Sequence, residues 1–174
     1  MIENFRVVTA PDPVLQKKAE SIKLVDKSIK LLMDKMLQTM YDNNGIGLAA
    51  NQVAILKRVI VIDLMDSESE YKNLFPLKMA NPVIINSSEA CSEETEGCLS
   101  LPQQSIIVER PEEITVQYLD YNNKTQVLKA DGLLSRAIQH EIDHLDGKLL
   151  INYLSHLKKT IALKKLTKIK RAAK

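Results

Sequence analysis

The sequence has few cysteines, few aromatic residues and no long apolar run. Its two cysteines, Cys91 and Cys98, cannot make the disulfide framework of a small secreted protein and indicate a reducing compartment. No apolar run approaches the roughly 18 residues that a membrane-spanning helix needs. The segment from Met1 to Arg6 lacks the apolar stretch of a signal peptide, and its acidic residue argues against a transit peptide. We therefore expect a cytoplasmic protein without a membrane segment.

Aromatic residues make up only 4% of the chain and Trp is absent, so aliphatic side chains and six Met must fill the interior. A hydrophobic content of 45% in 174 residues is sufficient for one core of ordinary size. The charge is unevenly placed, because residues 155–174 carry eight Lys or Arg and no acid. We expect a body over residues 1–154 and a basic helix over 155–174 that belongs to the same single domain.

Hydrophobic periodicity predicts two helices and several short strands before that basic helix. A stripe at helical spacing follows Asp26, a good N-cap, and stops near residues 43–45; its members are Ile29, Leu32, Met33, Met36, Leu37 and Met40. A second helix is expected to begin at Asp131, a good N-cap, and to run to about Leu145. Strands are expected over residues 58–64, 79–86, 114–118 and 125–129, the last two joined as a hairpin by Asn122 and Asn123. The pattern indicates an α+β fold, with short, mostly antiparallel strands packed around the second helix as a central helix, and a C-terminal helix.

The strongest functional signal is the segment His140-Glu141-Ile142-Asp143-His144 on the second helix. Residues at i and i+4 share a helix face, so both imidazoles can reach one metal ion, with Glu141 beside it. Leu133 and Ala137 continue the histidine face and predict the apolar wall of a pocket. The alternative, two histidines that only satisfy hydrogen bonds, is less consistent with the whole five-residue pattern.

A catalytic metal usually has three protein ligands and one open position, so a third ligand is expected. Cys98 lies in the segment Glu96-Gly97-Cys98-Leu99-Ser100-Leu101-Pro102, between two residues that favour tight turns. Its thiolate would complete a His2Cys site. From spacing alone, a small buried hydrophobic residue is an equally good interpretation of Cys98, and it is the better one for Cys91.

Three segments together resemble the peptide deformylase family over nearly the whole chain. Residues 45–52 (GIGLAANQ) are similar to the family's G-x-G-L-A-A-x-Q motif, residues 96–100 (EGCLS) to E-G-C-L-S, and residues 140–144 (HEIDH) to H-E-x-D-H. The resemblance implies removal of the formyl group from the N-terminal formylmethionine of nascent polypeptides. It also implies Cys98 as the third ligand of one divalent metal, with Fe2+ as the natural ion. The ligand types would equally accept Zn2+, Ni2+ or Co2+.

The resemblance also implies roles for residues around the metal. The amide of Gln52 would lie beside it, and Ile46 and Gly47 would give an edge for the peptide. As a mechanism, we expect Glu141 to act as general base. The negative charge on the formyl oxygen would be stabilised by the Gln52 side chain and the backbone N–H of Leu99.

The substrate would add as an extended strand near Ile46 and Gly97, with its methionine in a pocket of Ile46, Leu133, Ala137 and the His140 ring. Arg110 is expected to pair with Glu96 and hold the Cys98 loop. One departure concerns Ser105, where some bacterial members carry Arg, which affects peptide contacts beyond the first residues.

Two other functions and one further partner are consistent with the residues. A metallopeptidase of the HExxH type is the nearest enzyme alternative, although its usual downstream ligand is missing. A non-catalytic module with a structural zinc ion would need a fourth ligand. The basic helix is either a solvated surface helix or a contact to the ribosome through phosphate backbones. We expect a monomer.

Overall fold

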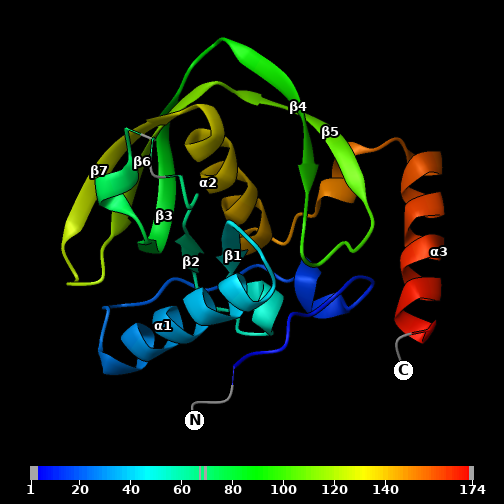
Figure 1. Ribbon diagram of the computed structural model, residues 1–174, viewed down its shortest axis with the longest axis horizontal. Helices are drawn as coiled ribbons and strands as arrows, with labels where there is room; N and C mark the ends of the chain where they lie inside the picture. The colour runs from blue at the N-terminus through cyan, green and yellow to red at the C-terminus, as the bar shows by residue number, and fades with distance from the viewer. Residues whose placement is uncertain (1–3, 67, 69, 173–174) are drawn as a thin grey trace.

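The computed structural model describes residues 4–66, 68 and 70–172, and within them the chain forms a mixed α+β fold (Figure 1). The α-helices are α1 (Lys27–Asp42), α2 (Gly132–Leu145) and α3 (His156–Ala172). The strands are β1 (Gly47–Ala49), β2 (Val59–Ile62), β3 (Leu77–Ser87), β4 (Cys91–Gly97), β5 (Ser105–Pro111), β6 (Glu113–Leu119) and β7 (Thr125–Asp131). Short 3-10 helices are η1 (Pro13–Gln16), η2 (Ala50–Val53), η3 (Lys72–Leu74) and η4 (Leu150–Tyr153). The expected fold class is confirmed.

The strands form two separate antiparallel sheets. Five of them pair in the order β1-β2-β3-β6-β7, and β4 pairs with β5 alone. The expected hairpin is β6–β7, in register from Glu113 with Asp131 to Leu119 with Thr125. In Figure 1, α2 lies between the larger sheet and the β4–β5 pair, with α3 beyond β5.

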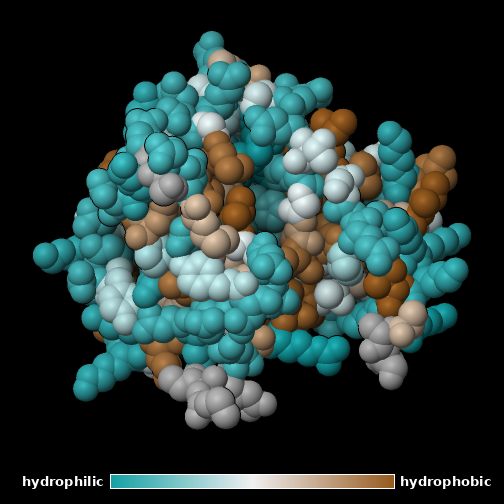
Figure 2. All heavy atoms as spheres, in the orientation of Figure 1, coloured by the Kyte–Doolittle hydropathy of each residue, from teal (hydrophilic) through white to brown (hydrophobic). Residues whose placement is uncertain are grey.

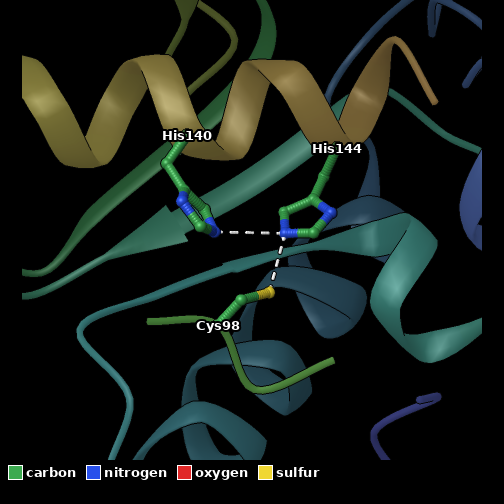
Figure 3. A group of neighbouring side chains, drawn as sticks. All are labelled: Cys98, His140 and His144. Carbon is green, nitrogen blue, oxygen red and sulfur yellow. Dashed lines mark hydrogen bonds between the residues drawn. The ribbon is translucent and has the colours of Figure 1, made fainter. Parts of the chain in front are cut away.

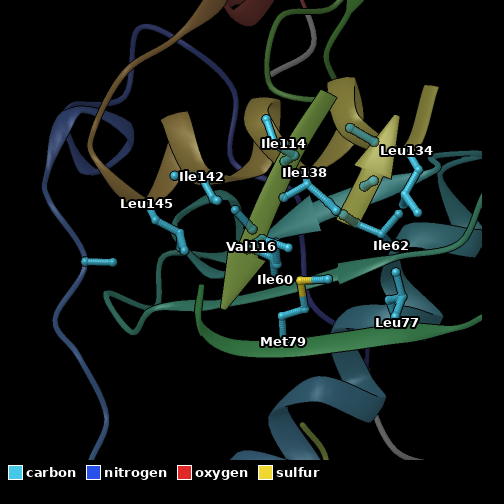
Figure 4. Close-up of a cluster of buried hydrophobic side chains, with 14 residues drawn as sticks. Ile60, Ile62, Leu77, Met79, Ile114, Val116, Leu134, Ile138, Ile142 and Leu145 are labelled. Atoms are coloured by element: carbon cyan, nitrogen blue, oxygen red, sulfur yellow. The ribbon is translucent and has the colours of Figure 1, made fainter. Parts of the chain in front are cut away.

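The larger sheet is covered by a helix on each face. Strand β2 is buried along its whole length, because Ile60 and Ile62 face α2 whereas Val59 and Val61 face α1. This explains why its sequence is a continuous apolar run and not an alternating one. Figure 4 shows the α2 side of this core, where Leu134, Ile138, Ile142 and Leu145 meet the strands. The helix is thus fixed against the sheet by the face that does not carry the histidines.

The helix boundaries follow the predicted signals with one exception. The Asp26 carboxylate accepts a hydrogen bond from the backbone N–H of Ile29 at 2.9 Å and caps α1, which ends at Asp42. Asp131 stands at the N-cap position of α2 but makes no side-chain cap bond. Its carboxylate accepts a hydrogen bond from the Tyr71 hydroxyl instead. The prediction of a capping side chain was therefore right for α1 and wrong for α2.

The basic C-terminal segment forms α3, which packs on the body through a third apolar cluster. Ala162 and Leu166 are buried there against residues that include Leu15, Ile106 and Leu150. The predicted helix extends to residue 174, and residues 173–174 lie outside the described part of the chain. Within that part, no helix combines the length and the apolar character that a membrane span requires.

Candidate metal centre and active-site cleft

Three potential metal ligands converge from α2 and from the loop after β4. The Nε2 atoms of His140 and His144 lie 3.2 Å apart on one face of the helix. The Sγ atom of Cys98 lies 3.2 Å from the His144 Nε2 atom. All three ligand atoms lie within 4.8 Å of one another, and Figure 3 shows the two imidazoles pointing from the helix toward the sulfur. The structure thus brings together the three residues predicted as ligands.

The donor set fits a divalent metal ion. Ligand atoms around one ion at about 2.0–2.3 Å are themselves roughly 3.3–3.6 Å apart, close to the separations seen here. Imidazole nitrogen and thiolate sulfur suit zinc, iron(II), nickel and cobalt. Cys98 and His140 also line an open cleft, which leaves access for a further, non-protein ligand. Such an arrangement is typical of a catalytic metal site and not of a closed structural one.

A buried carboxylate orients the first of the two histidines. Glu96, on β4, lies with Oε2 2.9 Å from the Nδ1 atom of His140. Arg110 donates to both carboxylate oxygens of Glu96, at 2.6 and 3.0 Å, so the predicted ion pair is present. Burial would raise the pKa of the Glu96 carboxyl, but hydrogen bonds from His140 and Arg110 outweigh it and lower the pKa to about 2. A carboxylate held in its charged form accepts the Nδ1 proton and leaves Nε2 as the ligand atom.

Glu141 lies beside the histidines with its carboxyl group in the interior. Only 4% of the residue is exposed, and its Oε2 atom has no hydrogen-bond partner among the described residues. Burial raises the pKa of this carboxyl to about 7. A pKa near neutrality is what a group needs in order both to accept and to release a proton.

Gln52, on η2, is fixed next to the cysteine. Its Oε1 atom accepts a hydrogen bond from the backbone N–H of Ala49 at 2.9 Å. Its Nε2 atom then donates to the Ser100 hydroxyl at 3.1 Å and to the Cys98 sulfur at 3.6 Å. The amide is therefore held beside the three candidate metal ligands by hydrogen bonds to both its oxygen and its nitrogen.

These groups share one cleft of about 510 Å3 between α2, the loop before β1 and the β4–β5 pair. Figure 2 shows the corresponding hollow on this face, with apolar side chains along its sides. The cleft is lined by all the residues predicted to bind substrate, by the three predicted catalytic residues and by two of the three predicted metal ligands: Ile46, Gly47, Gln52, Gly97, Cys98, Leu99, Leu133, Ala137, His140 and Glu141. His144 is buried and does not line the cleft. Ser105 lies at the cleft as well.

The sequence analysis missed a second arginine at this site. Arg136 stands one helical turn before His140, lines the cleft and donates to the Glu96 carboxylate at 2.8 Å. Nothing in its local pattern marks it, since its partners lie 28 to 44 residues away along the chain. The one signal in the sequence is that Arg136 is a charged residue on helix faces that otherwise carry apolar residues or histidine. An unpaired charge on a buried helix is costly.

Comparison with known proteins gives a consistent result. The family model described as Polypeptide deformylase matches residues 5–160. A peptide deformylase of Orientia tsutsugamushi (strain Ikeda) is 54% identical over 175 residues, covering 96% of both chains. A crystal structure of peptide deformylase from Ehrlichia chaffeensis superposes with a TM-score of 0.91 at 39% identity, covering 98% of this chain and 99% of that one. Another structure of the Ehrlichia protein, in complex with actinonin, has the same TM-score at 41% identity and the same coverage. The chain therefore belongs to the polypeptide deformylase family.

Proposed function

We propose that this chain hydrolyses the formyl group from the N-terminal formylmethionine of nascent polypeptides and releases formate. Deformylation is the function of the family to which it belongs. The observation that carries the proposal is the convergence of Cys98, His140 and His144 beside the buried Glu141 carboxyl in an open cleft.

One divalent metal would be held by Cys98, His140 and His144, and Fe2+ is the proposed natural ion. Zn2+, Ni2+ and Co2+ suit the same ligands. When bound, the ion supplies a more acidic water molecule and polarisation of the formyl carbonyl. The hydrogen bond between Glu96 and His140 would orient one of its ligands.

Glu141 would move the proton. Its carboxylate takes a proton from the attacking water and later gives it to the nitrogen of the departing amine. The formyl C–N bond breaks, the water oxygen becomes part of formate, and the peptide leaves with a free α-amino group. The buried, unpartnered Oε2 atom and the raised pKa of Glu141 support this role.

Gln52 and Leu99 would stabilise the charge that develops on the formyl oxygen. The Gln52 amide is already held beside Cys98, so little rearrangement is required. The backbone N–H of Leu99 follows Cys98 directly in the chain and would act from the same side. Donors fixed in advance are effective because they cost no reorganisation during the reaction.

The substrate would bind as an extended strand between two sheet edges. Within the described residues, β1 pairs only with β2 and β4 pairs only with β5, so each has a free edge. These edges reach the cleft at Ile46, Gly47 and Gly97, where main-chain hydrogen bonds to a peptide can form. The methionine side chain would occupy the apolar part formed by Ile46, Leu133, Ala137 and the His140 ring. All the lining residues of the cleft come from one chain, which supports a monomeric enzyme. Since its proposed substrates are chains leaving the ribosome, we place its action in the cytoplasm.

Formate release from a formyl-Met tripeptide tests the proposal. With protein purified without oxygen and supplied with Fe2+, we expect rapid release that a chelator abolishes and added Fe2+ restores. The matched control is the same tripeptide without the formyl group, from which no product should form. Absence of formate from protein with metal bound would contradict deformylation, and cleavage inside the peptide would instead indicate a metallopeptidase.

We also propose that α3 contacts the ribosome through its basic residues. Leu157 and Ile161 are exposed next to several exposed cations, including Lys164, Lys168 and Arg171. Since Ala162 and Leu166 pack on the body, removal of the helix would also disturb the fold. Charge reversal is the cleaner experiment.

Reversal of three exposed charges on α3, with Lys164, Lys168 and Arg171 replaced by Glu, is expected to weaken ribosome binding at low salt. Tripeptide deformylation should stay unchanged, because these residues lie outside the cleft. The expected loss grows as the salt concentration falls, since phosphate contacts are screened by salt. As a control, Lys18, Lys23 and Lys27 are also exposed and can be reversed in the same way. Equal binding by the two triple variants would argue against a contact through α3.

A further inference from the structure

Arg136 is a buried cation on α2, and the proposed reaction does not use it directly. It stands four residues before His140 on the helix, and its side chain is only 7% exposed. Burying a guanidinium is unfavourable unless its donors are matched by acceptors. Its partners therefore indicate what the residue is for.

The guanidinium group connects α2 with both strands of the smaller sheet. One terminal nitrogen donates to the Glu96 carboxylate at 2.8 Å and to the Val108 carbonyl, on β5, at 3.0 Å. The other donates to the backbone carbonyl and the hydroxyl of Ser92, on β4, at 2.9 and 3.0 Å. The Nε atom lies 3.5 Å from the exposed carboxylate of Glu94. One side chain thus holds two strands and the carboxylate that contacts His140.

This connection joins the two elements that carry the candidate metal ligands. His140 and His144 are on α2, whereas Cys98 follows β4 directly. Within the described residues the β4–β5 pair shares no strand pairing with the larger sheet. Backbone hydrogen bonds from Ser88 to Glu113 and from Glu112 to Ala90 join the two sheets at the end of β4 opposite to Cys98. Side-chain contacts between α2 and the β4–β5 pair therefore help to fix the separation at the Cys98 end. Arg110 reaches from β5 to Asp143 on α2, at 2.9 Å, and Arg136 reaches from α2 back to β4 and β5.

We infer that Arg136 is a positioning residue for the metal centre. Its guanidinium sets the distance of the Cys98 sulfur from the two imidazoles and holds Glu96 where it accepts the His140 Nδ1 proton. The inference rests on the proposed metal site. A planar fork with several donors reaches Glu96, Val108 and Ser92 together, and the single ammonium group of Lys cannot. Lys is therefore expected to restore the charge without restoring the geometry.

The test compares Arg136→Met and Arg136→Lys with the wild-type protein in metal affinity and in the spectrum of the Co2+-substituted protein. Affinity is measured by competition with a chelator. The absorption band between thiolate and Co2+ reports how Cys98 is placed. Loss of groups that support a ligand typically weakens metal binding 10- to 100-fold, and we expect roughly tenfold for Met because Arg136 acts through Glu96. The Co2+ band should shift in both variants.

Two control variants separate positioning from general stability. Arg58→Met removes another ion-paired arginine, 2.7 Å from the Asp146 carboxylate, at a place that does not line the cleft. Glu94→Gln removes the exposed partner of Arg136. Both should keep the affinity and the Co2+ spectrum of the wild-type protein, even if Arg58→Met lowers the melting temperature. Unchanged affinity and spectrum in Arg136→Met would overturn the inference.

If Arg136→Met does not fold, Arg136→Lys decides the matter, and a wild-type affinity and spectrum in that variant refute the positioning role. A wild-type protein that binds no metal at Cys98 would instead refute the proposed metal site. The wild-type and variant measurements therefore distinguish the two failures.

Discussion

Replacement of Glu141 by Gln is expected to lower the rate of formate release about 10²- to 10⁴-fold while the metal stays bound. Gln has nearly the same size as Glu but cannot accept the water proton. The three ligand atoms belong to Cys98, His140 and His144, so the substitution removes no ligand. Steady-state formate release and metal content of the same preparation give the two readouts.

Cys98→Ala provides the opposite pattern as a control. It removes a ligand, so both metal content and activity should fall. If Glu141→Gln kept full activity, the assignment of Glu141 as the base would be wrong. If it lost metal as Cys98→Ala does, Glu141 would belong to the metal site and not to proton transfer.

Replacement of Gly47 by Ala is expected to lower kcat/KM about 100-fold with little effect on the fold. A Cβ atom at Gly47 would clash with Glu141 Oε1 and would lie 3.0 Å from Glu141 Cδ, so the carboxyl group must move. A shift of about 1 Å in a reacting group can cost two orders of magnitude in rate. The short edge strand that contains Gly47 can accept a methyl group without losing its pairing to β2, because side chains do not take part in that ladder.

Thermal unfolding and metal content of Gly47→Ala should stay close to those of the wild-type protein, which separates a displaced Glu141 from a disrupted site. Activity within twofold of wild type would show that the carboxyl group has room to move without consequence. Glu141 would then not be confined by the β1 backbone at Gly47.

Periodicity predicted most of the elements whose burial differs between their faces. The α1 stripe, β6 and α2 carry apolar residues at the spacing of their structure and are found, with β7 as the return strand of the hairpin. Strand β5 was missed, although its alternate residues are buried. Strand β1 was not predicted, because three small or apolar residues show no period. Strand β4 was missed because most of its side chains are exposed, so its sequence has no apolar alternation. It forms a strand because it pairs with β5 along its whole length.

Local spacing also limits what could be predicted of the site. His140 and His144 follow from helix geometry, since both lie on one element. Cys98 came from the resemblance, and its distance from the histidines depends on how β4 packs against α2. The contacts of Arg136 depend on the same packing and could not be derived from its neighbours. The role of a residue whose partners are distant in the chain can be recognised only once the packing of the sheets and the helix is known.

The two free strand edges beside the cleft affect when a nascent chain can be deformylated. On the proposed binding mode, the first residues of the substrate must be extended, with their main-chain groups free to pair with both β1 and β4. A chain whose N-terminus has already entered a sheet or helix of its own cannot offer those groups. Deformylation therefore competes with folding of the substrate, and a protein whose first residues become buried early has only a short interval in which its formyl group can be removed.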